Sequence, residues 1–334
     1  MIITRTPLRI SFFGGGTDYP AWYRVHGGAV LSTSIDKYLY INCRYRPPFF
    51  EHKSRIVWSQ IEDVKHHEDI KHPAVRGVLQ YLNVDDGVEI HYDADLPART
   101  GLGSSSAFTV GLLHALRALK GTLVTKRDLA ATAIHIEQNI VEENVGSQDQ
   151  IVAAYGGFNR IEFFGDNNFR VTPVTVNRAR LNELRSHLML IFTGFSRTAS
   201  EIAVEQIKET SKREQELHAM RDMVDRAIEI LHSHESLHAF GELLNESWQL
   251  KRSLSSKITT PAIDELYKRA CSAGAIGGKI LGAGGGGFFL LFAPPERQPK
   301  IRETLQGLLE VPFEFENTGS HIAFYNPGHH HEPL

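Results

Sequence analysis

The sequence lacks most of the features that mark secreted, membrane-spanning and nucleic-acid-binding proteins. Only two cysteines occur in 334 residues, which excludes a disulfide framework and fits a reducing compartment. The longest apolar run, residues 288–293, is far too short to cross a bilayer, and the N-terminus lacks the apolar core of a signal peptide. The formal net charge of −3 provides no basic excess for nucleic acid. We therefore expect a cytoplasmic protein that binds neither nucleic acid nor a membrane.

The composition is that of an ordinary globular chain with length enough for two domains. Hydrophobic residues make up 42% of the chain, which supports a sizeable core. Strand-like segments fill the first 100 residues, helical patterns follow, and strands return at 158–164 and 188–193. Thr125-Lys-Arg-Asp is a capping-box pattern that opens a helix, and a longer helical region runs from about 199 to 232. This mixture predicts an α+β protein with two lobes.

A domain boundary is expected near residue 187, where a polar helical segment meets a new strand. The N-terminal lobe would then comprise residues 1–187 and the C-terminal lobe residues 188–327. The polar segment 328–334 carries three consecutive histidines, and we expect it to be a disordered tail.

Three glycine clusters stand out along the chain. Residues 7–18 read P-L-R-I-S-F-F-G-G-G-T-D, in which an apolar strand carrying Arg9 runs into three glycines and Asp18. Consecutive glycines cost conformational entropy on folding, so the backbone there must be needed for a close approach. Residues 281–289 read L-G-A-G-G-G-G-F-F and open into a strand. A dinucleotide fingerprint requires a helix at that point, so the G-x-G-x-x-G match is excluded by its context.

The second cluster, residues 97–108, reads P-A-R-T-G-L-G-S-S-S-A-F and leads from a strand into an apolar helix. Small residues let the backbone surround an anion, and a helix N-terminus offers unpaired N–H groups. A capped helix with a flexible entry would use the same serines. The preceding strand and the G-x-G favour phosphate binding, for which the candidate residues are Gly101, Leu102, Gly103, Ser104, Ser105, Ser106 and Ala107.

The candidates for catalytic and metal-binding side chains are acidic residues. Glu137 lies within a helical apolar pattern, and Asp149 follows twelve residues later on an expected turn, in G-S-Q-D-Q. Each has a simpler interpretation, because a lone aspartate after Gly-Ser is often a cap or turn residue and a helical glutamate often forms a salt bridge. Neither acid identifies a reaction by itself.

Together and in this order, the three glycine clusters and the G-S-Q-D-Q segment resemble the motifs of the GHMP small-molecule kinases. The resemblance covers residues 5 to 288. It implies a ribosomal-protein-S5-like N-terminal lobe and a ferredoxin-like C-terminal lobe, with ATP and a sugar bound between them. It also implies ATP and Mg²⁺ as cofactors, a sugar phosphate as substrate, and a monomer or homodimer.

The resemblance implies roles for individual residues. Residues 101–107 match the family's phosphate loop, with Ser105 as the hydroxyl beside magnesium and Glu137 as the carboxylate that binds it. Asp149 matches the catalytic aspartate, and Arg9 takes the place of a catalytic cation. The third cluster would contact the nucleotide through Gly282, Gly284 and Gly285.

The sugar contacts are where this chain departs from the galactokinases, whose first motif ends G-E-H-T-D-Y. Asp18 matches the sugar-binding acid, whereas Gly15 and Gly16 replace the Glu–His pair and open space. The motifs are more similar to those of the family's heptose kinases, which act on the anomeric hydroxyl of a heptose 7-phosphate. Arg197 is the candidate for holding that phosphate, ahead of Arg24, Lys37 and Arg99. The alternatives are another sugar, such as L-fucose or a galactose-like one, and a non-catalytic sensor.

Overall fold

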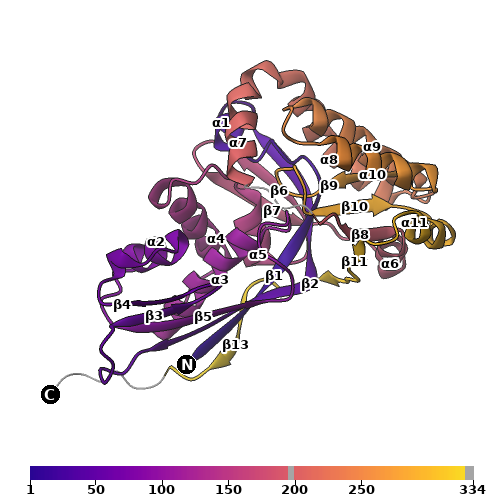
Figure 1. Cartoon of the computed structure of the whole chain (residues 1–334). Helices are drawn as coiled ribbons and strands as arrows, with labels where there is room; N and C mark the ends of the chain where they lie inside the picture. The colour runs from indigo at the N-terminus through magenta and orange to yellow at the C-terminus, as the bar shows by residue number, and fades with distance from the viewer. Residues whose placement is uncertain (195–198, 328–334) are drawn as a thin grey trace.

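The computed structural model describes residues 1–194 and 199–327 (Figure 1). The predicted α+β class and the two-lobed arrangement are confirmed, because one nine-stranded and one four-stranded sheet are each covered by helices. The expected disordered tail, 328–334, and the candidate Arg197 both lie outside the described residues. No helix in the described part of the chain is long and apolar enough to cross a membrane.

The large sheet is built on two long antiparallel strands, β1 (Ile2–Phe13) and β2 (Gly28–Tyr45). Its strand order is β13-β1-β2-β5-β3-β4, and β6 and β12 also pair with β2 while β7 pairs with β6. The other strands of this sheet are β3 (Ser54–Val57), β4 (Ile61–Val64), β5 (Val88–Ala94), β6 (Phe158–Phe164), β7 (Asn168–Pro173), β12 (Phe315–Glu316) and β13 (His321–Tyr325).

The small sheet has the order β11-β8-β10-β9 and is antiparallel throughout. Its strands are β8 (Leu188–Phe192), β9 (Gly277–Ile280), β10 (Phe288–Phe292) and β11 (Leu309–Glu310). Every residue of β9 and β10 is buried, and α9 (His238–Ser253) packs on β9. The expected strand–glycine loop–strand unit near residues 279–293 is therefore confirmed.

Among the helices of the first part of the chain, α3 (Ser104–Leu119) packs on β1 and β2 of the large sheet. The predicted helix start is confirmed, since Thr125 caps α4 by accepting a hydrogen bond from the main-chain N–H of Asp128. The remaining helices here are α1 (Pro20–His26), α2 (Pro73–Tyr81), α4 (Lys126–His135), a π-helical turn (Ile136–Ile140), α5 (Gln148–Tyr155) and α6 (Arg178–Ser186).

The expected helical region from about 199 to 232 is confirmed, although it is not one continuous helix. It is divided into α7 (Ala199–Glu209) and α8 (Glu214–His232), because Arg213 leaves the helical region with φ −122° and ψ 29°. The other helices of the second part are α10 (Pro261–Ser272) and α11 (Gln298–Thr304).

Residue 187 stays a prediction as a domain boundary. Strand β8 begins at Leu188, but the last two strands of the chain return to the large sheet, where β13 pairs with β1 and β12 with β2 (Figure 1). The chain therefore begins and ends its described strands in the same sheet.

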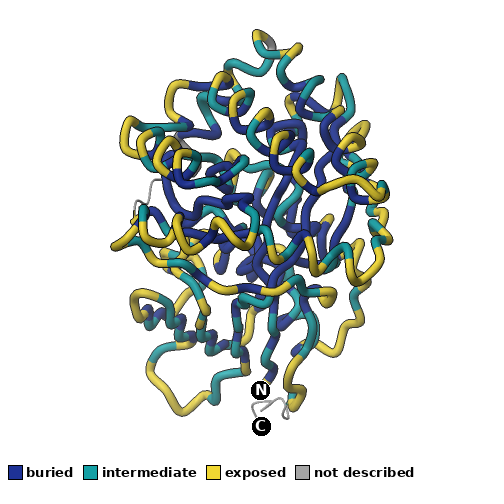
Figure 2. The backbone as a smooth tube through the Cα atoms, turned by 90° about the vertical axis from the view of Figure 1, so that its right-hand side faces the viewer, coloured by how far each residue is buried: buried dark blue, intermediate teal, exposed yellow. Residues whose placement is uncertain are grey.

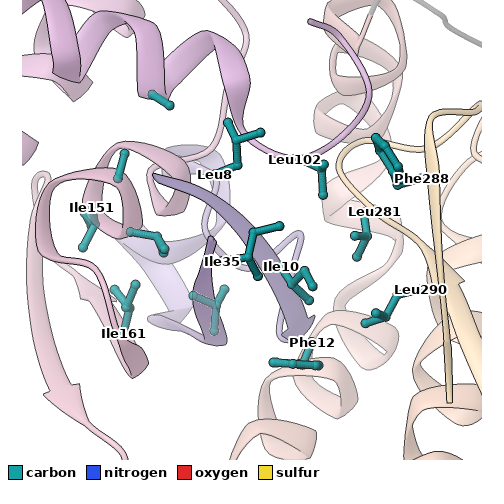
Figure 3. Close-up of a cluster of buried hydrophobic side chains, with 14 of the residues drawn as sticks. Leu8, Ile10, Phe12, Ile35, Leu102, Ile151, Ile161, Leu281, Phe288 and Leu290 are labelled. Atoms are coloured by element: carbon teal, nitrogen blue, oxygen red, sulfur yellow. The ribbon is translucent and has the colours of Figure 1, made fainter. Parts of the chain in front are cut away.

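A single apolar core runs through both lobes. Buried residues gather in the interior and exposed ones lie along the outer helices and loops (Figure 2). Figure 3 shows Ile10 of β1 and Leu290 of β10 in one cluster with Leu102 and Leu281, which come from the second and third glycine clusters. The two glycine-rich loops are thus anchored by apolar side chains that flank their glycines.

The backbones of these two loops touch. A Cβ on Gly101, whose φ is +86°, would lie 2.4 Å from the carbonyl oxygen of Leu281, and a Cβ on Gly282 would lie 2.6 Å from Gly101 Cα. The main-chain N–H of Phe288 also donates to Thr100 at 3.0 Å. Only glycine permits this contact, because any side chain would separate the loops.

We predict that Gly101→Ala destabilises the protein much more than Gly121→Ala. Both glycines have positive φ, but Gly121 has open space around it. Gly121→Ala should therefore cost only the backbone strain of ~1–2 kcal/mol. Gly101→Ala adds a clash with Leu281 and should cost at least ~2 kcal/mol more. Urea denaturation checks both variants, and equal losses would contradict the inferred loop contact.

Candidate active site

Arg9 and Asp149 form an ion pair at the centre of the candidate site. Arg9 donates from Nε to Asp149 Oδ1 at 2.8 Å and from Nη2 to Asp149 Oδ2 at 2.7 Å. Its remaining nitrogen, Nη1, donates to the carbonyl oxygen of Gly101. The Arg9 side chain is only 5% exposed and that of Asp149 is 24% exposed, so the carboxylate is the accessible partner. The structure thus brings the two expected catalytic residues together.

The phosphate loop, residues 101–107, lies directly on this pair. A Cβ on Gly103 would be 3.1 Å from Arg9 Cγ and 3.3 Å from Asp149 Oδ2, and Gly103 has φ +75°. Gly103 is also the N-cap residue of α3, and no side chain in the described part of the chain caps that helix. The first N–H groups of α3 therefore remain available to an anion next to Asp149.

Glu137 is buried beneath the phosphate loop, in the π-helical turn that follows α4. Its Oε2 accepts hydrogen bonds from Ser106 Oγ at 2.8 Å and from Gln150 Nε2, whereas its Oε1 is buried and has no partner among the described residues. Burial raises the pKa of Glu137 to about 7, although the nearby Thr109 and the hydrogen bonds from Ser106 and Gln150 act to lower it.

This arrangement fits a magnesium ion. The buried, unpartnered carboxylate oxygen of Glu137 is a hard ligand, and the Ser106 hydroxyl lies beside it. The described residues contain no group of three or more His, Cys, Asp or Glu that could hold a metal by itself. Magnesium needs no such group, since it is commonly held by one or two carboxylates together with substrate phosphates.

The structure places Ser106 beside Glu137, while the expected role of Ser105 beside magnesium stays a prediction. Ser106 is buried and bonds Glu137, while Ser105 is exposed on the first turn of α3. Consecutive residues on a helix point about 100° apart, so only one of the three serines can face Glu137. Three serines in a row do not reveal which one that is.

Asp18 lies close enough to Asp149 for their charges to interact and is 2% exposed. Its Oδ1 accepts from the main-chain N–H of Gly16 at 2.9 Å, and its Oδ2 accepts from Gln148 Nε2 at 3.1 Å. Burial raises the pKa of Asp18, the charge of Asp149 raises it further, and these hydrogen bonds oppose the shift. Asp18 thus stands beside the ion pair, as its expected sugar-binding role requires.

The third glycine loop, residues 282–287, joins the site through the backbone. Gly282 touches the phosphate loop at Gly101, and Gly284 lies so close to Ile258 that a Cβ would be 2.7 Å from the Ile258 carbonyl oxygen. The N–H of Gly285 donates to that same oxygen at 2.8 Å. Of these three expected nucleotide contacts, Gly282 lies against the phosphate loop, whereas Gly284 and Gly285 lie against Ile258.

Two buried lysines that the sequence pattern does not single out lie near the site. Lys251 of α9 donates from Nζ to the carbonyl oxygens of Ile280, at 3.0 Å, and Gly282, and Lys279 donates to that of Phe12 at 2.8 Å. Burial, with the nearby charge of Arg9, lowers the pKa of Lys251 to about 7. Burial likewise lowers the pKa of Lys279. Bound phosphate would favour the charged form of both.

The structure gives little support to the residues expected to hold a substrate phosphate. Arg24 and Lys37 each form an ion pair with an aspartate, and Arg99 is exposed two residues before the phosphate loop. Arg197, the first candidate, lies outside the described residues.

Family comparisons agree with this geometry. The model of the GHMP kinase N-terminal domain matches residues 70–157, and that of the GHMP kinase C-terminal domain matches residues 224–310. Together the two matches cover more than half of the chain, in the order of the two lobes.

Individual relatives are similar to this protein over nearly the whole length of its chain. A D-glycero-alpha-D-manno-heptose 7-phosphate kinase from Campylobacter jejuni is 28% identical over 91% of this chain and 93% of its own. A bifunctional fucokinase/GDP-fucose pyrophosphorylase from Arabidopsis thaliana is 24% identical over 90% of this chain but only 30% of that longer protein. The solved structure of a D-glycero-D-manno-heptose 1-phosphate kinase from Bacteroides thetaiotaomicron has a TM-score of 0.77 at 23% identity, covering 98% of this chain and 100% of that one, which shows a shared fold.

We predict that Glu137→Gln becomes more stable relative to the wild type as the pH rises. Because the native pKa of Glu137 is raised to about 7, its stabilising contribution is complete below the ordinary value of 4.5 and is lost through pH 7. Glutamine stays neutral, so the stability difference should shift by roughly 2–3 kcal/mol from pH 5 to pH 8.

Denaturation in metal-free buffer at several pH values checks this prediction. The exposed neighbour Glu142 provides the matched control, Glu142→Gln, which should follow the wild type at every pH. A difference between Glu137→Gln and the wild type that does not change with pH would contradict the inferred burial of the carboxyl group.

Proposed function

The chain belongs to the GHMP kinases, a family of ATP-dependent phosphotransferases, and on that premise we propose that it phosphorylates the anomeric hydroxyl of a sugar phosphate. The proposed substrate is D-glycero-D-manno-heptose 7-phosphate, converted to the 1,7-bisphosphate for the synthesis of a nucleotide-activated heptose. The observation that carries the kinase chemistry is the Arg9–Asp149 pair beneath Gly103 of the phosphate loop.

The chemistry follows from what each of these groups can do. Transfer of the γ-phosphoryl group depends mainly on positioning and charge stabilisation. The attacking sugar hydroxyl would give its proton to Asp149, whose oxygens each keep a lone pair beyond the bond from Arg9. Arg9 stays charged throughout and would offset negative charge on the transferred group. The phosphate loop would hold the ATP phosphates with its N–H groups.

Magnesium is part of this proposal. A Mg²⁺ ion held by Glu137 and Ser106 would neutralise phosphate oxygens of ATP. The support comes from the buried, unpartnered Oε1 of Glu137 and from the Ser106 hydroxyl beside it.

The choice of a heptose phosphate rests on two supports. One is the similarity to the Campylobacter jejuni heptose 7-phosphate kinase over nearly the full length of both chains. The other is the replacement of the galactokinase-type Glu–His pair by Gly15 and Gly16. A 1-kinase for L-fucose is the alternative, favoured by the match to the Arabidopsis thaliana fucokinase. A non-catalytic sensor is disfavoured, because sensing alone needs no accessible carboxylate at the phosphate loop. The cytoplasmic location and the monomeric or homodimeric state remain predictions.

We predict that Asp149→Asn lowers kcat by about 10²–10⁴-fold, because asparagine cannot accept the proton of the sugar hydroxyl. ATP binding, measured by calorimetry, should change less than about threefold, because Asp149 does not itself hold the nucleotide. Asp166→Asn, on an exposed aspartate paired with Arg24, is the control.

The substrate is tested with a panel of D-glycero-D-manno-heptose 7-phosphate, L-fucose, D-galactose and D-mannose, assayed for ATP-dependent phosphorylation. Turnover of the heptose phosphate well above that of the free hexoses is expected. Good turnover of a free hexose with none of the heptose phosphate would overturn the proposed substrate. Full activity of Asp149→Asn would overturn the proposed mechanism.

We predict that Ser106→Ala raises the Mg²⁺ concentration for half-maximal activity more than Ser105→Ala does. The reason is that, of these two serines, only Ser106 donates a hydrogen bond to Glu137. Losing one metal-side hydroxyl should shift this concentration by about tenfold. A magnesium titration of both variants at saturating ATP checks the prediction, and a larger shift for Ser105→Ala would restore Ser105 as the metal-side serine.

A further inference from the structure

Neither the backbone conformation nor the packing at position 15 requires a glycine. The φ of Gly15 lies outside the left-handed region, and a Cβ built on it would meet nothing nearer than Ser11 Oγ at 3.8 Å and Gln148 Nε2 at 3.9 Å. Every other glycine among residues 1–194 and 199–327 either has a positive φ or would place a Cβ within 3.0 Å of a protein atom. Neither backbone strain nor packing therefore requires a glycine at position 15, where a methyl group would fit with ordinary contacts.

The two side chains that face Gly15 have unused hydrogen-bonding atoms. Ser11 is 6% exposed, and its Oγ is buried with no partner in the described part of the protein. Gln148 donates from Nε2 to Asp18, while its Oε1 is also buried and finds no partner among the described residues. A buried polar atom left unpaired costs about 1–3 kcal/mol, so a ligand that pairs both atoms would recover that energy.

Both residues are placed beside the reacting groups. Ser11 and Arg9 lie two positions apart on β1 and so point to the same face of the strand, about 7 Å apart along it. Gln148 directly precedes Asp149 at the start of α5. A sugar whose reacting hydroxyl sits at Asp149 would therefore extend a different hydroxyl toward Ser11.

We propose that Ser11 and Gln148 determine specificity by holding one non-reacting hydroxyl of the sugar in the space beside Gly15. The sugar hydroxyl donates to Gln148 Oε1 and accepts from Ser11 Oγ, which uses both unpaired atoms. This inference rests on the proposed sugar-kinase function and deepens it, because it names the residues that choose among sugars.

The test compares Ser11→Ala with the wild type on D-glycero-D-manno-heptose 7-phosphate and on its 2-deoxy, 3-deoxy and 4-deoxy analogues. The wild type should lose at least about tenfold in kcat/KM on one analogue, because that sugar leaves both protein atoms unpaired. Ser11→Ala should lose about tenfold on the parent sugar but match the wild type on that one analogue. The KM for ATP should stay the same.

Two further variants separate this role from a structural one. Ser32 is the cross-strand partner of Ser11, and its buried hydroxyl donates to Ile10, so Ser32→Ala should lower Tm without altering the discrimination among sugars. Gly15→Ala should keep the wild-type Tm, since its methyl group makes only ordinary contacts with Ser11 and Gln148. It should nevertheless lose at least about tenfold in kcat/KM for the sugar, because the methyl group occupies the ligand's space.

Several outcomes would overturn the inference. Equal losses for Ser11→Ala on the parent and all analogues would show a general disturbance, and no loss at all would show that a bound water satisfies Ser11. Full activity of Gly15→Ala would show that the space is unused. If the wild type phosphorylates L-fucose and not the heptose phosphate, the substrate proposal fails, and the same comparison is made with L-fucose and its deoxy analogues. If it phosphorylates neither sugar, both proposals fail.

Discussion

The site depends on one buried ion pair, between Arg9 and Asp149. A buried pair is stable only when its geometry is good and the remaining hydrogen-bonding groups are satisfied. Here both carboxylate oxygens are bonded by the guanidinium, and its third arm is bonded to the carbonyl oxygen of Gly101. The phosphate loop must therefore run within hydrogen-bond distance of the pair. That requirement explains Gly103, since a side chain at this position would occupy the space next to Arg9 and Asp149.

Backbone contacts connect the phosphate loop to the C-terminal part of the chain. Gly101 touches Gly282, and the Gly282 carbonyl oxygen is held by Lys251 of α9. Burial and the charge of Arg9 lower the pKa of Lys251 to about 7 while Asp18 and Asp149 act to raise it, so the charge of the lysine that holds the third loop depends on the charges in the site. Burial lowers the pKa of the nearby Lys279 as well, so an anionic phosphoryl group bound here would favour the charged form of both lysines.

The sequence predicts features whose signals are local. Glycine runs, the Thr125 cap and the paired strands around the third loop are all determined by neighbours in the chain, and they appear as expected. The choice between Ser105 and Ser106 depends on helix phase relative to Glu137, which comes from another helix. Lys251 lies in an amphipathic helix where lysine is ordinary, so only the fold reveals its burial. The roles of individual residues therefore required the tertiary structure.

Of the three glycines in the first loop, residues 14–16, the protein's own structure requires the outer two but not the middle one. Gly14 is required by packing, because a Cβ there would lie 1.9 Å from the carbonyl oxygen of Ala29, and Gly16 has φ +104° with Gln206 2.8 Å from its would-be Cβ. Only Gly15 is free of both constraints. The loop's shape therefore comes from the outer two glycines, and its capacity to admit a ligand comes from the middle one. If a larger residue occupied position 15, the outer glycines would still form the same turn, but the unpaired atoms of Ser11 and Gln148 would face a protein side chain. Under the proposed role of Ser11 and Gln148, a substitution at this one position would change the choice of sugar without rebuilding the loop.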